Sequence, residues 1–353
     1  MTTTSDIGST ELALRVLHEG TVIPAHPLVL TEDRTLDERR QRAVSRYYID
    51  AGAGGLAVGV HTTQFGIRKH GMFEDVLRVS AETVADWADR PMVLVAGVIG
   101  DTEQALGEAV LARDLGYHAA LVNVAAWKGK GEHDILEHCR AIATETPIVG
   151  FALLPEVGGF HLSYDFWRAF VEIQNVVAIK LAPFNRYRTL DIVRAVVAAR
   201  AEDRITLYTG NDDHIVLDLL QPFIVPRDGV DVTVRIKGGL LGHWSVWTQK
   251  ATSQFAEISA ARGSAVSQEL LGLDSRVTDS NEAIYDARNS FAGCIPGCLE
   301  VLRRQGLVEG TWCLDPAERL SPGQLAEIDR VYAAHPDLND DAFVAQHLAT
   351  WFA

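Results

Sequence analysis

One stretch, residues 175–183, decides the fold: Asn175-Val176-Val177-Ala178-Ile179-Lys180-Leu181-Ala182-Pro183. Its apolar run predicts a strand buried on both faces, as in a parallel sheet that helices cover. Lys180 then stands at the end of the strand, where water is scarce. Poor solvation disfavours an ammonium ion and lowers its pKa, and such an amine can attack a carbonyl group to form a Schiff base. An isolated lysine at a strand end equally fits a side chain that extends into water, so the rest of the chain has to decide.

Short apolar runs and helical patterns alternate along the chain. We expect eight strands: residues 21–28, 55–60, 92–97, 119–124, 147–154, the Lys180 strand, 205–209 and 230–235. Helical patterns follow them at residues 36–51, 80–88, 102–115, 133–144, 163–173, 190–199, 213–220 and 243–258. Eight such units predict a (β/α)8 TIM barrel over residues 21–260. A doubly wound open sheet is the competing fold, but no Gly-x-Gly-x-x-Gly follows the first strand.

The remaining segments flank this barrel. Residues 1–20 form an N-terminal segment, and residues 261–353 are predicted to be a C-terminal helical extension packed on the barrel. The extension is helical in pattern, with interruptions at Pro296, Pro316 and Pro322. No Pro/Gly/Ser-rich linker separates it from the barrel, so we expect no independent domain there.

Composition excludes several classes of function. The 353 residues carry a net charge of -15, which argues against nucleic acid or an anionic membrane as a partner. No run reaches the roughly 18 apolar residues that a membrane helix needs, and residues 1–10 do not look like a signal peptide. The four cysteines lack zinc-site spacing, and Cys294 and Cys298 fit buried helix positions. We therefore expect a cytoplasmic protein.

Polar residues follow several of the predicted strands. Catalytic residues of such barrels come from the carboxyl ends of the strands and the loops behind them. That rule selects the following residues besides Lys180: His26, His61, Thr62, Thr63, Asn123, Asn211 and Asp212. Lysine as nucleophile and histidine as proton carrier suit carbonyl chemistry, with His61 as the first choice and His26 as the second.

Each of these features has a second interpretation. Either histidine alone fits a structural, hydrogen-bonded role. His26, His61 and Asp212 could instead bind a divalent metal, although no His-x-His or Glu-x-x-His pair supports it. We expect Asp212-Asp213 to cap the helix after the seventh strand. Residues 238–242 are expected to form a glycine-rich turn after the eighth strand, with a phosphate site as the alternative.

The order of motifs resembles the dihydrodipicolinate synthase / N-acetylneuraminate lyase superfamily, from about Val22 to the C-terminus. The motifs are His26-Pro27 in the first strand, Ala51 to Leu56 as a helix-to-strand turn, and Val95-Ala96-Gly97. They continue with Val177 to Lys180, Tyr208 to Asp212, Gly306-Leu307-Val308 and Leu320-Ser321-Pro322. The resemblance implies that Lys180 forms an imine with a 2-oxo acid, without a metal or organic cofactor. It also implies a homo-oligomer, either a dimer or a tetramer.

The chain departs from that family where the substrate would bind. The usual Gly-Thr-Thr-Gly-Glu is replaced by Gly59-Val60-His61-Thr62-Thr63. The fifth-strand tyrosine that relays protons in the family is replaced by Ala152, with Phe151 beside it, and Phe151 becomes a candidate substrate contact. Val157 stands where some relatives carry an arginine. We therefore expect an apolar pocket and doubt the lysine-pathway synthase activity.

These observations lead to one principal functional hypothesis and two alternatives. The first is a Schiff-base-forming lyase, an aldolase or hydro-lyase, that acts through Lys180 on a small carbonyl substrate, a 2-oxo acid being one candidate. Its only cofactor chemistry would be the covalent imine, and no metal is expected. The alternatives are a metal-assisted barrel hydrolase or isomerase and a non-catalytic binding barrel.

Overall fold

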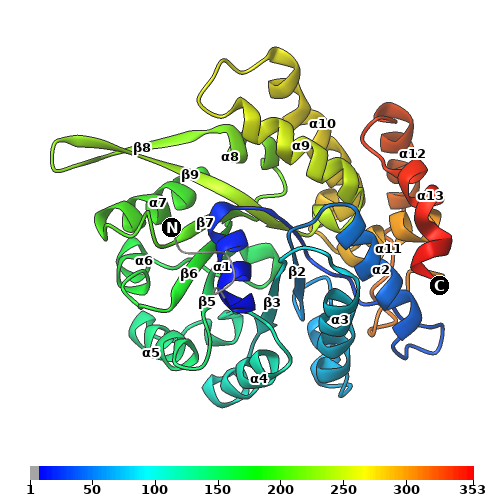
Figure 1. Cartoon of the computed structure of the whole chain (residues 1–353), viewed down its shortest axis with the longest axis horizontal. Coiled ribbons are helices and arrows are strands. Elements are labelled where there is room, and N and C mark those ends of the chain that lie inside the picture. The colour runs from blue at the N-terminus through cyan, green and yellow to red at the C-terminus, as the bar shows by residue number, and fades with distance from the viewer. Residues whose placement is uncertain (1–7) are drawn as a thin grey trace.

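The computed structural model describes residues 8–353, and within them eight parallel strands form the predicted TIM barrel (Figure 1). The parallel strands are β1 (Val22–Pro24), β2 (Gly55–Val58), β3 (Val93–Val98), β4 (Ala119–Val122), β5 (Ile148–Leu153), β6 (Val176–Ala182), β7 (Thr206–Thr209) and the second half of β9 (Val230–Leu241). Their order is β1-β9-β7-β6-β5-β4-β3-β2. A bridge between Ala25 and Ala57 brings β1 beside β2 and closes the barrel.

A ring of helices covers the outside of the barrel. These are α2 (Glu38–Asp50), α3 (Phe73–Trp87), α4 (Thr102–Asp114), α5 (Glu132–Ala143), α6 (Tyr164–Phe170), α7 (Arg186–Ala198), α8 (Ile215–Leu220) and α9 (Thr248–Ala261). Several begin at a side chain that accepts a hydrogen bond from a backbone amide, such as Asp101 from Gln104 and Ser163 from Phe166. Such caps satisfy amides that the helix itself leaves free.

A helix not predicted from the sequence, α1 (Ser9–Glu19), lies against the barrel at the centre of Figure 1 and contacts β3, β6, β7 and β9. Its Ala13 and Leu17 join a buried cluster with strand residues that include Val93 and Ala178. The Tyr208 hydroxyl donates to the Leu17 carbonyl oxygen at 2.8 Å. The predicted N-terminal segment, residues 1–20, therefore contains a helix that covers the barrel interior, while residues 1–7 lie outside the described part.

The predicted eighth strand was placed too early. Residues 230–235 pair with β8 (Pro222–Arg227) in an antiparallel hairpin that projects from the body (Figure 1). The barrel strand is the later part of β9, where Ile236 pairs with Leu207 and Leu241 with Pro24. Asp228-Gly229, both with positive φ, form the hairpin turn, and an Asp-Gly pair between alternating apolar residues is a hairpin signal.

The glycine-rich turn expected at residues 238–242 is consequently wrong for its first residues, because Gly238 and Gly239 lie inside β9. A Cβ on Gly238 would stand 2.5 Å from the Thr21 backbone oxygen, and one on Gly239 would stand 2.5 Å from the Trp244 ring. Glycine is needed there because neighbouring chain segments approach the strand closely.

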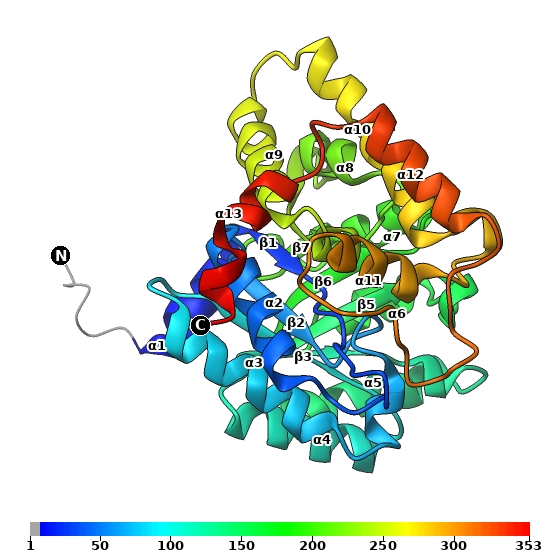
Figure 2. The same ribbon diagram turned by 90° about the vertical axis from the view of Figure 1, so that its right-hand side faces the viewer.

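The C-terminal extension consists of α10 (Gln268–Tyr285), α11 (Cys294–Arg304), α12 (Gln324–Ala334) and α13 (Asp341–Trp351). It returns to the N-terminal half of the barrel, where α13 packs on α2 (Figure 2). Trp351 is buried and its indole N–H donates to Asp50 at 2.7 Å. The Tyr47 hydroxyl donates to Asp340 at 2.7 Å. The extension is thus fixed to the barrel by buried polar contacts as well as by apolar packing.

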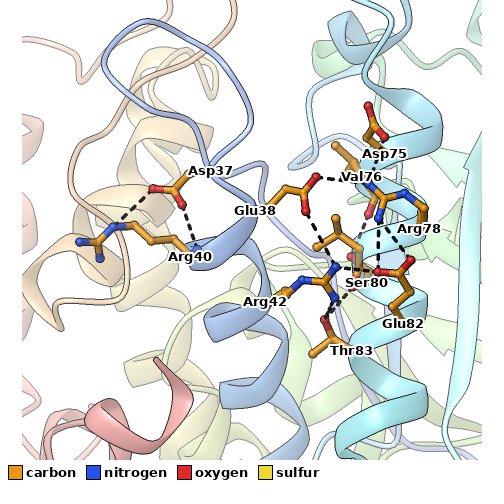
Figure 3. Close-up of polar contacts among 11 residues, drawn as sticks. Asp37, Glu38, Arg40, Arg42, Asp75, Val76, Arg78, Ser80, Glu82 and Thr83 are labelled. Atoms are coloured by element: carbon orange, nitrogen blue, oxygen red, sulfur yellow. Dashed lines mark hydrogen bonds and ion pairs between the residues drawn. The ribbon is translucent and has the colours of Figure 1, made fainter. Parts of the chain in front are cut away.

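An ion-pair network joins α2 and α3 at the surface (Figure 3). Arg42 of α2 pairs with Glu82 of α3 at 2.6 Å, and Arg78 of α3 pairs with Glu38 of α2 at 3.2 Å. Pairs this exposed contribute little each, so packing of the apolar faces holds these helices together.

Two smaller expectations concern the cysteines and membranes. Cys294 and Cys298 are buried in α11 without a disulfide, as predicted. Across residues 8–353, the helices are all too short or too polar to cross a bilayer.

Leu17→Ala should lower the free energy of unfolding by about 2–5 kcal/mol, because it leaves a cavity where α1 meets the barrel interior. Urea denaturation followed by circular dichroism measures it. Arg15→Ala, on the exposed face of the same helix, is the control and should change stability by less than about 0.5 kcal/mol. Equal effects of the two substitutions would show that α1 does not cover the interior.

Candidate active site

A cavity opens at the carboxyl ends of the barrel strands. Apolar side chains form most of its wall: Ala25, Val60, Phe65, Ile99, Leu121, Phe151, Leu153, Leu154, Val157, Ala182, Phe184 and Phe291. The polar side chains are fewer: His61, Thr62, Asn123, Lys180, Asp212, Tyr285 and Cys294. An apolar pocket with a few converging polar groups is the usual form of a small-molecule site.

Lys180 reaches this cavity from the end of β6. Its Nζ lies 4.6 Å from the centre of the Phe151 ring, which belongs to the neighbouring residue in the β5–β6 register. Burial lowers the pKa of Lys180 to about 8, although Asp212 opposes part of this shift. About a tenth of the lysine is then neutral at pH 7, far more than for a solvated lysine.

Asp212 is the carboxylate that faces Lys180. Burial raises its pKa to about 7, while the positive charge of Lys180 acts in the opposite direction. Its Oδ1 accepts a hydrogen bond from the His243 backbone N–H at 3.2 Å. The expected capping role is wrong, because α8 begins after His214 without any side-chain cap. Asp212 is instead directed into the cavity.

His61 lines the same cavity as Lys180. Burial and the nearby ammonium group lower the pKa of His61 to about 4. The imidazole is therefore neutral at physiological pH and can accept a proton. Its ring lies 6.0 Å from that of Phe65.

Gly210 leaves the space that the lysine side chain occupies. A Cβ at this position would stand 2.5 Å from Lys180 Cε and 2.9 Å from Ala182 Cβ. Any larger residue would have to displace the lysine or the strand.

The structure brings six of the predicted site residues to the cavity: Lys180, His61, Thr62, Asn123, Phe151 and Asp212. Thr63 and Asn211 do not line it. The Thr63 hydroxyl donates to the His26 carbonyl oxygen at 2.7 Å. Asn211 donates to Asp218 and accepts from the Phe184 N–H at 3.0 Å, so it shapes the loop that carries Phe184.

His26 does not support the catalytic role predicted for it. Its Nε2 is 2.8 Å from the Ser45 hydroxyl and its Nδ1 is 2.9 Å from the Gln41 amide nitrogen, both on α2. The preceding residue, Ala25, is the one that lines the cavity. Successive side chains of an extended segment point to opposite faces, so His26 is directed outward.

The metal-site alternative is not supported by this arrangement. Across residues 8–353, no three His, Cys, Asp or Glu side chains are grouped closely enough to hold a metal ion. Since His26 is directed toward α2, the three proposed ligands His26, His61 and Asp212 do not meet.

Several cavity residues beyond the predicted set come from loops and from the C-terminal extension. Phe184 follows β6, and Tyr285, Phe291 and Cys294 belong to the C-terminal extension. The Phe184 and Phe291 rings pack edge to face at 5.9 Å. A Cβ on Gly242 would lie 1.4 Å from the Tyr285 hydroxyl, so this glycine admits the phenol. The extension therefore forms part of the cavity wall.

Sequence comparison agrees with this geometry. The pattern of the Dihydrodipicolinate synthetase family matches residues 19–231, and the chain belongs to this family. A 4-hydroxy-tetrahydrodipicolinate synthase from Clostridium novyi (strain NT) is 23% identical over 188 residues, which are 52% of this chain and 60% of the relative. The alignment thus spans less than two thirds of that enzyme.

Solved structures share the fold over a greater length. A dihydrodipicolinate synthase from Oceanobacillus iheyensis has a TM-score of 0.75 at 15% identity, covering 92% of this chain and 99% of that one. An N-acetylneuraminate lyase from Fusobacterium nucleatum has a TM-score of 0.71 at 16% identity, covering 92% and 100%. At such identities the likeness establishes the barrel with its helical extension and nothing finer.

Asp212→Asn should lower the pKa of Lys180 further, because the carboxylate raises it. The rate of imine formation with a test aldehyde, measured against pH, should then reach its plateau at lower pH than in the unchanged protein. Asp213→Asn, one residue away but outside the cavity wall, is the matched control. An unchanged or upward shift in Asp212→Asn would contradict the electrostatic pairing.

Proposed function

We propose that this protein is a class I aldolase-type lyase that binds a small carbonyl compound as an imine on Lys180. The observation that carries the proposal is the position of Lys180, at the end of a central barrel strand inside an apolar cavity, with its pKa lowered by burial. A neutral amine in such a site is a nucleophile for carbonyl carbon.

The reaction begins when the Lys180 amine adds to the carbonyl carbon and a proton moves from nitrogen to oxygen, which gives a carbinolamine. A proton from a cavity acid or solvent then allows its hydroxyl to leave as water and yields the protonated imine. The iminium accepts the electron pair of a carbon–carbon bond one position further on as the β-hydroxyl of the leaving carbonyl fragment gives its proton to a base. Alternatively, the adjacent carbon loses a proton to a base and the β-hydroxyl leaves as water. Protonation of the resulting enamine and hydrolysis of the imine return the free amine. The same steps in reverse form that bond.

Proton transfer in these steps requires a side chain in the cavity that can accept and return a proton. His61 is the first candidate, since its ring lines the same cavity as Lys180 and is neutral at physiological pH, so that it can accept a proton. Asp212 supports the charge of the iminium and, with its raised pKa, can itself exchange a proton near neutrality. The fifth-strand position of the family's tyrosine carries Ala152 and cannot take part.

Other features belong to this proposal. No cofactor is needed beyond the covalent imine, and the partner is a small carbonyl compound. The family resemblance leads us to expect a homo-oligomer, and the sequence composition leads us to expect a cytoplasmic protein. The departures at Ala152 and Val157 argue against the lysine-pathway synthase reaction, and Phe151 and Val157 both lie in the cavity wall.

Borohydride reduction in the presence of a panel of carbonyl compounds should attach the carbon skeleton to Lys180. Intact-mass and peptide mass spectrometry measure the adduct, because reduction converts the reversible imine into a stable secondary amine. Lys180→Ala should lose the adduct, while Lys130→Ala, at an exposed lysine, should keep it. Failure of every carbonyl compound to label Lys180 would overturn the proposal.

His61→Ala should mainly affect the rate of imine formation, whereas His26→Ala should mainly affect stability. His61→Ala should slow imine formation by about 10²-fold or more, the usual contribution of a general acid–base group, with little loss of stability. His26→Ala should lower the melting temperature, since it breaks buried hydrogen bonds to Ser45 and Gln41, yet leave the rate of the folded protein nearly unchanged. The reverse pattern would assign catalysis to His26.

A further inference from the structure

The cavity presents little that would bind a carboxylate next to the reacting carbonyl group. Among the described residues of its wall, Lys180 is the sole lysine or arginine, and that group is consumed as the nucleophile. His61 adds no positive charge, because its ring is neutral at physiological pH. The position of a carboxylate-binding arginine in some relatives holds Val157, which is part of the apolar wall.

The two threonine hydroxyls that remain from the family pattern are already engaged. Thr62 donates to the Ala25 carbonyl oxygen at 2.8 Å, and Thr63 donates to the His26 carbonyl oxygen at 2.7 Å. Both hydroxyls therefore use their protons to hold the loop after β2 against the end of β1. Besides backbone N–H groups and Lys180, the described wall offers donors that carry no charge: the Asn123 amide, the Tyr285 hydroxyl and the neutral His61 ring. A substrate carboxylate would therefore find hydrogen bonds there but no second positive charge.

The remaining charge of the cavity is negative. Asp212 faces Lys180 from the end of β7. Once Lys180 has become an imine, a carboxylate on the adjacent carbon would share one small apolar space with this aspartate. Like charges in such surroundings repel strongly because solvent screens them poorly.

The wall that surrounds the reacting centre favours an apolar substrate. Phe151 lies under the Lys180 amine, and Phe184 and Phe291 close another side with their rings in contact. Aromatic and branched groups gain most from burial against such a surface.

We propose that the substrate of Lys180 is a neutral aldehyde or ketone with an aryl or branched alkyl group, and not a 2-oxo acid. This inference rests on the proposed imine chemistry and names its substrate class. The amine adds to the neutral carbonyl, and the carbinolamine takes up a proton and loses water. Asp212 then pairs with the iminium charge instead of repelling a neighbouring carboxylate. The C-terminal extension contributes to substrate selection, since Phe291 and Tyr285 form part of the cavity wall.

A matched pair of compounds tests the proposal: 2-methylpropanal and 3-methyl-2-oxobutanoate share the branched group and differ in the carboxylate. The rate of borohydride-trapped labelling at Lys180 is measured for each and divided by the rate with free Nα-acetyl-lysine, which corrects for intrinsic reactivity. The corrected rate should be at least about tenfold higher for the aldehyde, a difference of about 1.4 kcal/mol.

Asp212→Asn separates the charge from the shape of the cavity. The substitution keeps the size of the side chain and removes its charge, so the preference for the aldehyde should fall by about threefold or more as the 2-oxo acid gains. An unchanged preference would show that Asp212 does not exclude the carboxylate and would overturn the electrostatic part of the proposal.

The outcomes distinguish this inference from the function on which it rests. Preferential labelling of Lys180 by the aldehyde supports both. Equal or faster corrected labelling by the 2-oxo acid overturns the substrate class and leaves the imine chemistry standing. Absence of labelling at Lys180 with either compound, while Lys180→Ala behaves identically, overturns both.

Discussion

The burial of the Lys180 amine is the constraint that explains the arrangement of the residues around the cavity. An ammonium ion is unfavourable among the apolar side chains of Phe151, Leu153 and Ala182, so the pKa of Lys180 is lowered. The nearby carboxylate of Asp212 offsets part of this effect by stabilising the charge. Other features of the barrel mouth follow from this placement. Gly210 gives the lysine stem its space, and the His243 amide fixes the Asp212 carboxylate.

The C-terminal extension is part of the same arrangement. Its α13 is anchored far from the cavity by Trp351 and Asp340 against α2. The same extension carries the end of α10, the start of α11 and the loop that joins them, where Tyr285, Cys294 and Phe291 line the cavity. Residues more than 100 positions after Lys180 thereby complete its surroundings. Changes in the extension should consequently alter substrate preference as well as stability.

The sequence was sufficient for the fold and for the position of the lysine. Alternating apolar runs predicted the barrel, and the apolar run before Lys180 predicted a buried strand. The direction of the side chains at the strand ends was harder to predict, because neighbouring residues point in opposite directions. Ala25 lines the cavity, whereas His26 binds α2. Asp212 lines the cavity, whereas Asn211 does not. Pattern alone places a residue near a strand end to within one position, which is too coarse to assign its direction.

Three other features were not predicted from the sequence, because they depend on long-range packing or because a local signal was overlooked. The role of α1 depends on the packing of Ala13 and Leu17 against the barrel interior, and a local sequence pattern does not reveal this contact. The β8–β9 hairpin had a local signal in Asp228-Gly229, flanked by alternating apolar residues. The contribution of Tyr285 and Phe291 depends on how the extension packs and could not be derived from their neighbours in the chain.

The most direct measurement of the central claim is the titration of the Lys180 amine itself. Protein labelled with ¹³C at lysine Cε, compared with Lys180→Arg for assignment, reports this pKa by NMR. Burial of the amine predicts a midpoint near 8 for Lys180, well below those of the exposed lysines. A midpoint close to 10.5, the ordinary lysine value, would contradict the claim that burial prepares this residue as a nucleophile.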